Sequence, residues 1–122
     1  MPARARIREV SRVSTPDITK QLVALIGRKL TAYIGGVLDV RAVDRWIAGS
    51  TVYGDGERRL RFAYQVVKML ASKEDPRVIQ AWLIGLNPEL GDRVPLRLLR
   101  ESPLEEIAPE IMDAVRAFLS GG

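Results

Sequence analysis

Apolar residues recur along this chain at the three- and four-residue spacings of helices, and no segment alternates as a half-buried strand does. In the first half, the stripe from Ile18 to Ile26 predicts a helix over residues 15–26. Two shorter helices are expected at residues 28–34 and 40–48. Residues suited to helix ends lie at these boundaries: Thr15, Pro16, Gly27, Gly35, Gly36, Asp39 and Gly49.

The second half contains the longest apolar stripe. Leu60, Ala63, Val67 and Leu70 share one face of a helix expected over residues 57–71. Chain-breaking pairs divide the remaining residues, at Asp75-Pro76, Asn87-Pro88 and Gly91-Asp92.

Three further helices are therefore expected, the first beginning at Pro76 and the others covering residues 95–100 and 104–119. Ser102 and Glu105 have the spacing of a capping box at the start of the last helix. Pro109, inside that helix, predicts either a kink or a restart. The pattern as a whole predicts an all-α fold, a small helical bundle.

Composition removes most enzymatic chemistry. The chain has 122 residues, 47% of them hydrophobic, and it has neither His nor Cys. An imidazole base, a Cys nucleophile, a Ser-His-Asp triad and a thiolate or imidazole zinc site are therefore excluded. We expect no metal, no cofactor and no catalysis. Because no apolar run approaches the roughly 18 residues of a membrane span, a cytoplasmic protein that works by binding is expected.

Charge is distributed unevenly. Residues 1–60 hold 11 basic and 6 acidic side chains, whereas residues 61–122 hold 8 basic and 9 acidic ones. A basic first half suggests a polyanionic partner such as nucleic acid.

Residues 22–49 have the layout of a helix-turn-helix unit. Val43, Trp46 and Ile47 would bury one face of the third helix and leave the other face free to enter the major groove. Candidate DNA-binding residues lie on that face, on the preceding helix and just after the unit: Arg28, Lys29, Arg41, Ala42, Asp44, Arg45 and Ser50. The alternative is that Arg41 and Arg45 are solvated charges paired with Asp44.

Several segments carry a family resemblance. They are Leu30–Val37, Ala42–Gly49, Arg59–Val66, Ala81–Leu90, Pro95-Leu96, Leu98-Leu99 and Val115–Leu119. In these segments the chain resembles the Xre/MbcA/ParS antitoxin family, over about residues 20–119. The stretch from Trp82 to Leu90, followed by Pro95, is the more specific part of the resemblance.

The resemblance implies a type II antitoxin that binds operator DNA as a homodimer and represses its own operon. It further implies a cognate toxin partner, usually a RES-domain protein that consumes NAD, whose active site the antitoxin occludes. The implied division is a flexible basic arm at residues 1–14, a helix-turn-helix DNA-binding region at 15–73 and a toxin-binding region at 74–122.

Within the toxin-binding region, Trp82, Leu83, Leu86 and Leu90 are expected in the core. The candidates for toxin binding are residues expected to be exposed: Arg93, Arg97, Arg100, Arg116, Phe118 and Gly122.

One spacing departs from the family's pattern. Nine positions separate Ile34 from Val43, where about seven are common in a compact helix-turn-helix. Either the second helix continues to Val37 or the turn is longer. Two other functional classes remain open at this point: a helix-turn-helix regulator whose second half only dimerises, and an enzyme that uses carboxylates such as Glu105 and Glu110, which the missing His and Cys disfavour.

Overall fold

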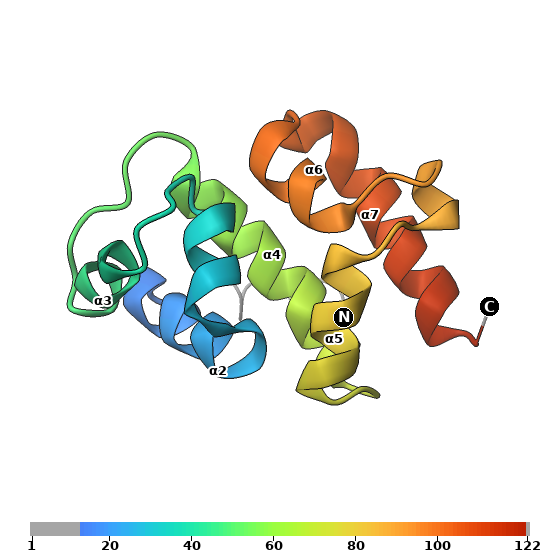
Figure 1. Ribbon diagram of the computed structural model, residues 1–122, viewed down its shortest axis with the longest axis horizontal. Helices are drawn as coiled ribbons and strands as arrows, with labels where there is room; N and C mark the ends of the chain where they lie inside the picture. Colours follow the sequence, from blue (N-terminus) through green and yellow to red (C-terminus); the bar gives the residue numbers. More distant parts are fainter. Residues whose placement is uncertain (1–12, 122) are drawn as a thin grey trace.

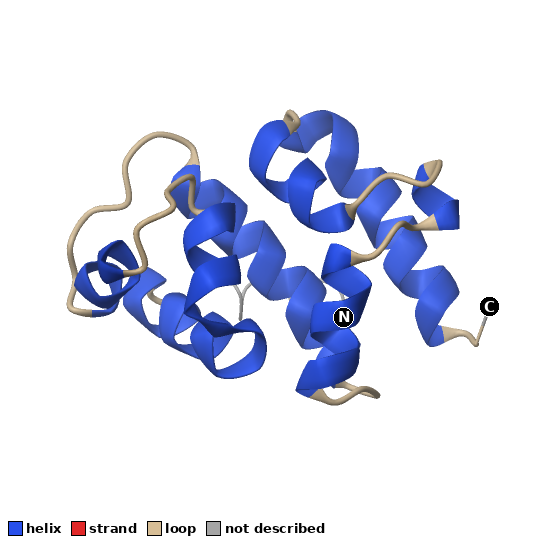
Figure 2. Cartoon of the chain, viewed as in Figure 1, coloured by secondary structure: helices blue, strands red, loops and turns tan. Residues whose placement is uncertain are grey.

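The computed structural model describes residues 13–121, and every regular element within them is helical (Figures 1 and 2). The elements are α2 (Thr15–Ile34), α3 (Arg41–Ile47), α4 (Gly56–Ala71), α5 (Pro76–Ile84), the 3₁₀ helix η1 (Pro88–Leu90), α6 (Pro95–Glu101) and α7 (Leu104–Leu119). The expected all-α fold is confirmed. Residues 1–12 of the expected arm, and Gly122, lie outside the described residues.

Gly27 divides α2 into the two helices that the sequence predicts. Its φ of 85° and ψ of 168° are a conformation that glycine adopts readily and residues with a Cβ do not. The two parts of α2 consequently run in different directions in Figure 1. The second part stops at Ile34, and Gly35 is its C-cap.

Two predicted helix starts have different outcomes. Asp75 caps α5 as expected, because its carboxylate accepts from the Val78 backbone N–H at 3.1 Å. The cap of α2, however, is Ser14 and not Thr15: the Ser14 hydroxyl oxygen accepts from the Asp17 backbone N–H at 3.2 Å.

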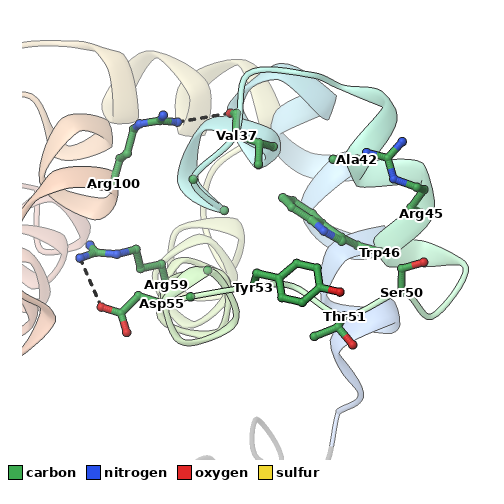
Figure 3. A pocket seen from close by; sticks show the side chains of 14 residues that line it. Val37, Ala42, Arg45, Trp46, Ser50, Thr51, Tyr53, Asp55, Arg59 and Arg100 are labelled. Carbon is green, nitrogen blue, oxygen red and sulfur yellow. Dashed lines mark hydrogen bonds and ion pairs between the residues drawn. The ribbon is translucent and has the colours of Figure 1, made fainter.

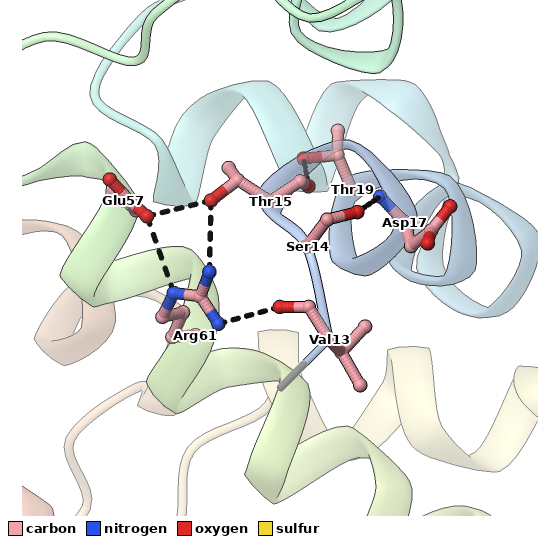
Figure 4. A network of polar contacts seen from close by, with 7 residues as sticks. All are labelled: Val13, Ser14, Thr15, Asp17, Thr19, Glu57 and Arg61. Atoms are coloured by element: carbon pink, nitrogen blue, oxygen red, sulfur yellow. Dashed lines mark hydrogen bonds and ion pairs between the residues drawn. The ribbon is translucent and has the colours of Figure 1, made fainter. Parts of the chain in front are cut away.

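Thr15 instead joins α2 to α4 (Figure 4). Its hydroxyl donates to Glu57 Oε1 at 2.7 Å and accepts from Arg61 Nη2 at 3.1 Å. Arg61 also donates to Glu57 and to the Val13 carbonyl. This network lowers the pKa of Glu57, mainly through the Thr15 hydroxyl and then through Arg61.

The capping box predicted at Ser102 and Glu105 is wrong. Ser102 is the C-cap of α6, and its backbone N–H donates to the Leu98 carbonyl, so α7 begins after Pro103 without a side-chain cap. Glu105 pairs with Arg58 of α4 at 2.6 Å, a contact between distant segments that the sequence did not predict.

The chain breaks lie where the sequence places them. Asn87 caps η1 by accepting from the Glu89 backbone N–H, and Gly91 and Asp92 both have left-handed φ values, 64° and 62°. Pro109 does not cause a restart, since α7 is one helix from Leu104 to Leu119. In the second turn of a helix, proline removes a single backbone bond and leaves the rest intact.

Helix α4 is the centre of the fold. In Figure 1 it crosses the molecule between α2 and α3 on one side and α5 to α7 on the other. The predicted stripe of Leu60, Ala63, Val67 and Leu70 is fully buried. Since α2 and α4 both contact the C-terminal helices, the two halves of the chain share one hydrophobic core.

Two arginines join the halves further by capping helix C-termini. Arg59 of α4 donates from Nη1 to the Leu99 and Ser102 carbonyls at the end of α6, at 2.8 Å each. Arg100 of α6 makes the reciprocal contact, donating to the Tyr33 carbonyl near the end of α2 at 2.8 Å. Cations placed at helix C-termini also favour the helix dipole.

Candidate functional site

Helix α3 is held rigidly from one side. Val43 and Trp46 are buried, as predicted, while Ile47 is half-buried. A Cβ on Gly35 would lie 2.5 Å from the Trp46 ring, so the end of α2 fits against this indole only because residue 35 is glycine. The close contact fixes the position of α3 relative to α2.

The turn between these helices runs from Gly35 to Val40. The second helix does not continue through the glycines, and the nine-residue spacing is accommodated by a longer turn. Val40 is the N-cap residue of α3, but the Asp39 carboxylate still accepts from the Arg41 backbone N–H at 2.9 Å.

Ala42 does not lie on the free face of α3. Its exposed fraction is 6%, because it shares the buried face with Val43 and Trp46, one helical turn further on. Ala42 is therefore removed from the candidates for base contact.

The charged residues of α3 are exposed, but Asp44 is not the partner of its arginines. Asp44 pairs with Arg28 at 2.9 Å, and Arg41 pairs with Asp39 at 3.0 Å. Hydrogen bonds from Arg41 lower the pKa of Asp39. Among the described residues, Arg45 has neither an ion pair nor a hydrogen bond from its side chain.

Lys29 and Ser50 are also exposed. The Arg28–Asp44 ion pair places the start of the second part of α2 beside α3. We use the name α3 surface for five exposed residues of the helix-turn-helix unit and the position after it: Arg28, Lys29, Arg41, Arg45 and Ser50.

The candidate toxin-binding residues of the C-terminal region differ in their exposure and in their partners. Arg97 and Arg116 are exposed and pair only within their own helices, with Glu101 and Asp113. Arg93 is exposed and links to Glu110 of α7 at 2.6 Å.

The expectation of exposure is wrong for Arg100. It is half-buried, its Nη1 donates to the Tyr33 and Val37 carbonyls, and its guanidinium lies 4.5 Å from the centre of the Tyr33 ring. Phe118 is half-buried too and contacts Trp82, with 6.5 Å between ring centres. Gly122 lies outside the described residues.

An exposed apolar pair at the C-terminal end of α5, Ile84 and Leu86, was not predicted from the sequence. Leu86, expected in the core, is 72% exposed, and Ile84 is 57% exposed. Leu83 and Leu90 are buried as expected. Leu86 is not, because α5 ends at Ile84 and a helical spacing no longer determines which way residue 86 faces.

A pocket of about 730 Å³ lies beside α3 (Figure 3). Its walls come from the turn after α2, from α3, from residues 50–56 and from two arginines of α4 and α6: Gly35, Gly36, Val37, Ala42, Arg45, Trp46, Ser50, Thr51, Tyr53, Gly54, Asp55, Gly56, Arg59 and Arg100. This pocket was not predicted from the sequence, although all of its lining residues except Arg100 lie within residues 35–59.

Within residues 13–121, no three potential metal-ligating side chains come together, and no helix has both the length and the apolar character needed to cross a bilayer. Comparison with protein-family models finds no match, and no curated protein or solved structure matches the chain. The comparisons therefore assign no family, and what the site can do follows from the chemistry of its residues alone.

Proposed function

We propose that this chain is a type II antitoxin: a cytoplasmic, non-catalytic protein that binds operator DNA through its helix-turn-helix unit and neutralises a cognate toxin through its C-terminal region. The observation that carries the proposal is the arrangement of α3. One face is buried through Val43 and Trp46, and the opposite face presents Arg41 and Arg45 to solvent.

The α3 surface suits a polyanion. Arg28, Lys29, Arg41 and Arg45 outnumber Asp39 and Asp44 there. Arginine can bind guanine O6 and N7 with two hydrogen bonds, and lysine or arginine on the preceding helix can bind phosphate. Arg45 is the residue best placed for base contact, since no carboxylate among the described residues forms an ion pair with it and Asp39 interacts with it only through longer-range attraction.

A homodimer is the proposed DNA-binding species. Two such units read half-sites about one helical turn, 34–36 Å, apart on the duplex, so a palindromic operator is expected.

The toxin-binding surface is proposed on the C-terminal side of the core. Arg97 and Arg116 are exposed there, and Ile84 and Leu86 add apolar area of the kind found at the centre of interfaces. The proposed partner is a RES-domain toxin that consumes NAD and is blocked at its substrate pocket. The resemblance over residues 81–99 is what supports this choice.

Titration of the DNA immediately upstream of the reading frame tests the DNA-binding part. We expect specific binding whose affinity falls with salt, with a log–log slope of about −0.9 for each phosphate neutralised. Arg45→Ala should weaken binding by about 1–3 kcal/mol, whereas Arg77→Ala, an equal charge change on the exposed side of α5, should not. A flat salt response, or equal losses in both variants, would contradict the proposal.

Co-purification with the product of the adjacent reading frame separates the two candidate roles. An antitoxin forms a stable complex with that product, and a regulator whose second half only dimerises does not. Loss of the complex in Leu86→Asp, with retention in Glu106→Gln, would place the interface on the apolar pair.

A further inference from the structure

The pocket beside α3 has more positive charge than its walls neutralise. Arg45, Arg59 and Arg100 line it, against one carboxylate, Asp55. The Asp55 carboxylate lies 3.8 Å from the Arg59 guanidinium and 3.6 Å from that of Arg58, both on α4. These two arginines neutralise its charge at the α4 end of the pocket. At the opposite end, Arg45 forms no ion pair with any described residue.

The guanidinium groups also retain donors. A guanidinium carries five N–H donors, and Arg100 uses only those of Nη1, on two carbonyls. Its Nε and Nη2 have no hydrogen-bond partner among the described residues. No side-chain nitrogen of Arg45 has a hydrogen-bond partner among the described residues. The hydroxyl-bearing residues Ser50 and Thr51, also exposed, line the same end of the pocket.

Two aromatic rings lie between the charged ends. In Figure 3, Trp46 and Tyr53 occupy the middle of the view, with Arg59 and Arg100 on one side and Arg45 and Ser50 on the other. Trp46 is buried, whereas Tyr53 is 85% exposed and has no ring partner within residues 13–121. An exposed tyrosine face beside arginines is the arrangement on which proteins stack nucleobases.

We propose that this pocket binds a nucleoside phosphate, with the phosphate on Arg45 and the hydroxyls beside it and the base on Tyr53. The volume of about 730 Å³ lies within the range of small-molecule sites, roughly 300–1,000 Å³. A paired base inside a duplex cannot present its face to Tyr53. The ligand is therefore a free mononucleotide or an unpaired nucleotide of a strand. It shares Arg45 with the proposed duplex-binding surface, so the two ligands compete for that side chain, and titration with mononucleotides tests the pocket in the absence of duplex.

Isothermal titration calorimetry of the full chain tests this. The probes are the four ribonucleoside 5′-monophosphates, the matching nucleosides and inorganic phosphate. We expect at least one monophosphate to bind at one site per chain, at least tenfold more tightly than its nucleoside or phosphate alone, because it engages both parts of the pocket. Saturation by none of the monophosphates would overturn the proposal.

Three variants locate the site. Arg45→Gln should lower the affinity for the nucleotide by about tenfold or more, because a charge-assisted hydrogen bond is lost. Tyr53→Leu should lower the affinity by a similar factor, because the base loses its stacking partner. Neither residue is buried, so both variants should retain the melting curve of the parent chain. Arg77→Gln removes an equal charge outside the pocket and should leave the affinity unchanged. Equal affinity in all variants, or equal losses in all three, would overturn the assignment.

A second arm identifies the source of the ligand. A single-stranded pentanucleotide with a 5′-phosphate is titrated into the same proteins. If it binds more tightly than the monophosphates and loses affinity in Arg45→Gln, the natural ligand is a nucleotide of a strand; if it binds equally or more weakly, it is a free nucleotide. Both results require the pocket, and failure of duplex titration would affect neither.

Discussion

At the scale of single residues, the most informative contact on the α3 surface is the ion pair of Arg41 with Asp39. Several hydrogen bonds join the two side chains, and Asp39 also accepts from the Arg41 backbone N–H. The sequence put Asp39 at the helix start but could not show that its carboxylate would hold the neighbouring guanidinium. This pairing makes Arg41 a weaker candidate for base contact than Arg45.

Removing that carboxylate should strengthen DNA binding. Asp39→Asn keeps a side-chain oxygen for the Arg41 backbone N–H, frees the guanidinium and removes a negative charge facing the phosphates. We expect a gain of about 1 kcal/mol at low salt, measured by titration against operator DNA. Asp113→Asn, an equal charge change at an exposed residue of α7, is the control. An unchanged or lower affinity in Asp39→Asn alone would remove Arg41 from the interface.

The contact between Gly35 and Trp46 gives a stability prediction. Gly35→Ala places a Cβ against the indole and should destabilise the fold by about 1–3 kcal/mol in urea unfolding. Trp46→Phe lacks the ring atoms nearest to that Cβ, so the double variant should lose less than the sum of the two single variants. Additive losses would mean that Gly35 and the indole are not in contact.

At the scale of elements, local signals predicted boundaries well. Gly27 and Gly49 end helices because glycine, having no Cβ, adopts a positive φ without strain. Asp75 caps α5 because the backbone N–H that it binds is only three residues away. Ser102 and Glu105 have equally good local spacing, yet Ser102 is the C-cap of α6 and Pro103 is the N-cap of α7, so the two residues do not form a capping box. Local spacing thus misplaces a boundary where one helix ends directly before the next begins.

The network joining α2 and α4 should depend on pH. The pKa of Glu57 is lowered from its ordinary value of 4.5, so its stabilisation is present above that value and is lost as the pH falls through the lower folded-state pKa. Urea midpoints measured from pH 7 to pH 3 should therefore fall less steeply in Glu57→Gln than in the parent chain. Glu106→Gln, at an exposed residue of the first turn of α7, should leave the slope unchanged.

At the scale of the whole molecule, the two regions that the sequence separates at residue 73 share one hydrophobic core. An arginine of each region also binds a carbonyl at a helix end of the other region. The sequence predicted the α-helices but neither the 3₁₀ helix η1 nor these arginine contacts, since Arg100 and the Tyr33 carbonyl lie 67 positions apart. The pocket was not predicted either: most of its lining lies within residues 35–59, and only Arg100 comes from a distant segment. The helices could therefore be predicted from the spacing of apolar residues, whereas contacts such as that of Arg100 with the end of α2 could not.

Arg100→Ala should reveal this coupling. Loss of two charge-assisted hydrogen bonds to carbonyls should cost about 1.5–3 kcal/mol, while both halves still unfold in one transition, followed by circular dichroism and by tryptophan fluorescence. Trp46 and Trp82 report on different halves. Arg97→Ala, exposed on the same helix, should change stability by less than about 0.5 kcal/mol. Two separate transitions in the parent chain would contradict a shared core.

Neutralisation of a toxin is the activity that distinguishes an antitoxin from a simple DNA-binding regulator. Growth of cells is measured after induction of the adjacent reading frame, with and without co-expression of this chain. We expect the adjacent product to stop growth when it is expressed alone and to be harmless when the chain is present. An adjacent product that is harmless alone, or toxicity that this chain does not relieve, would contradict the antitoxin function.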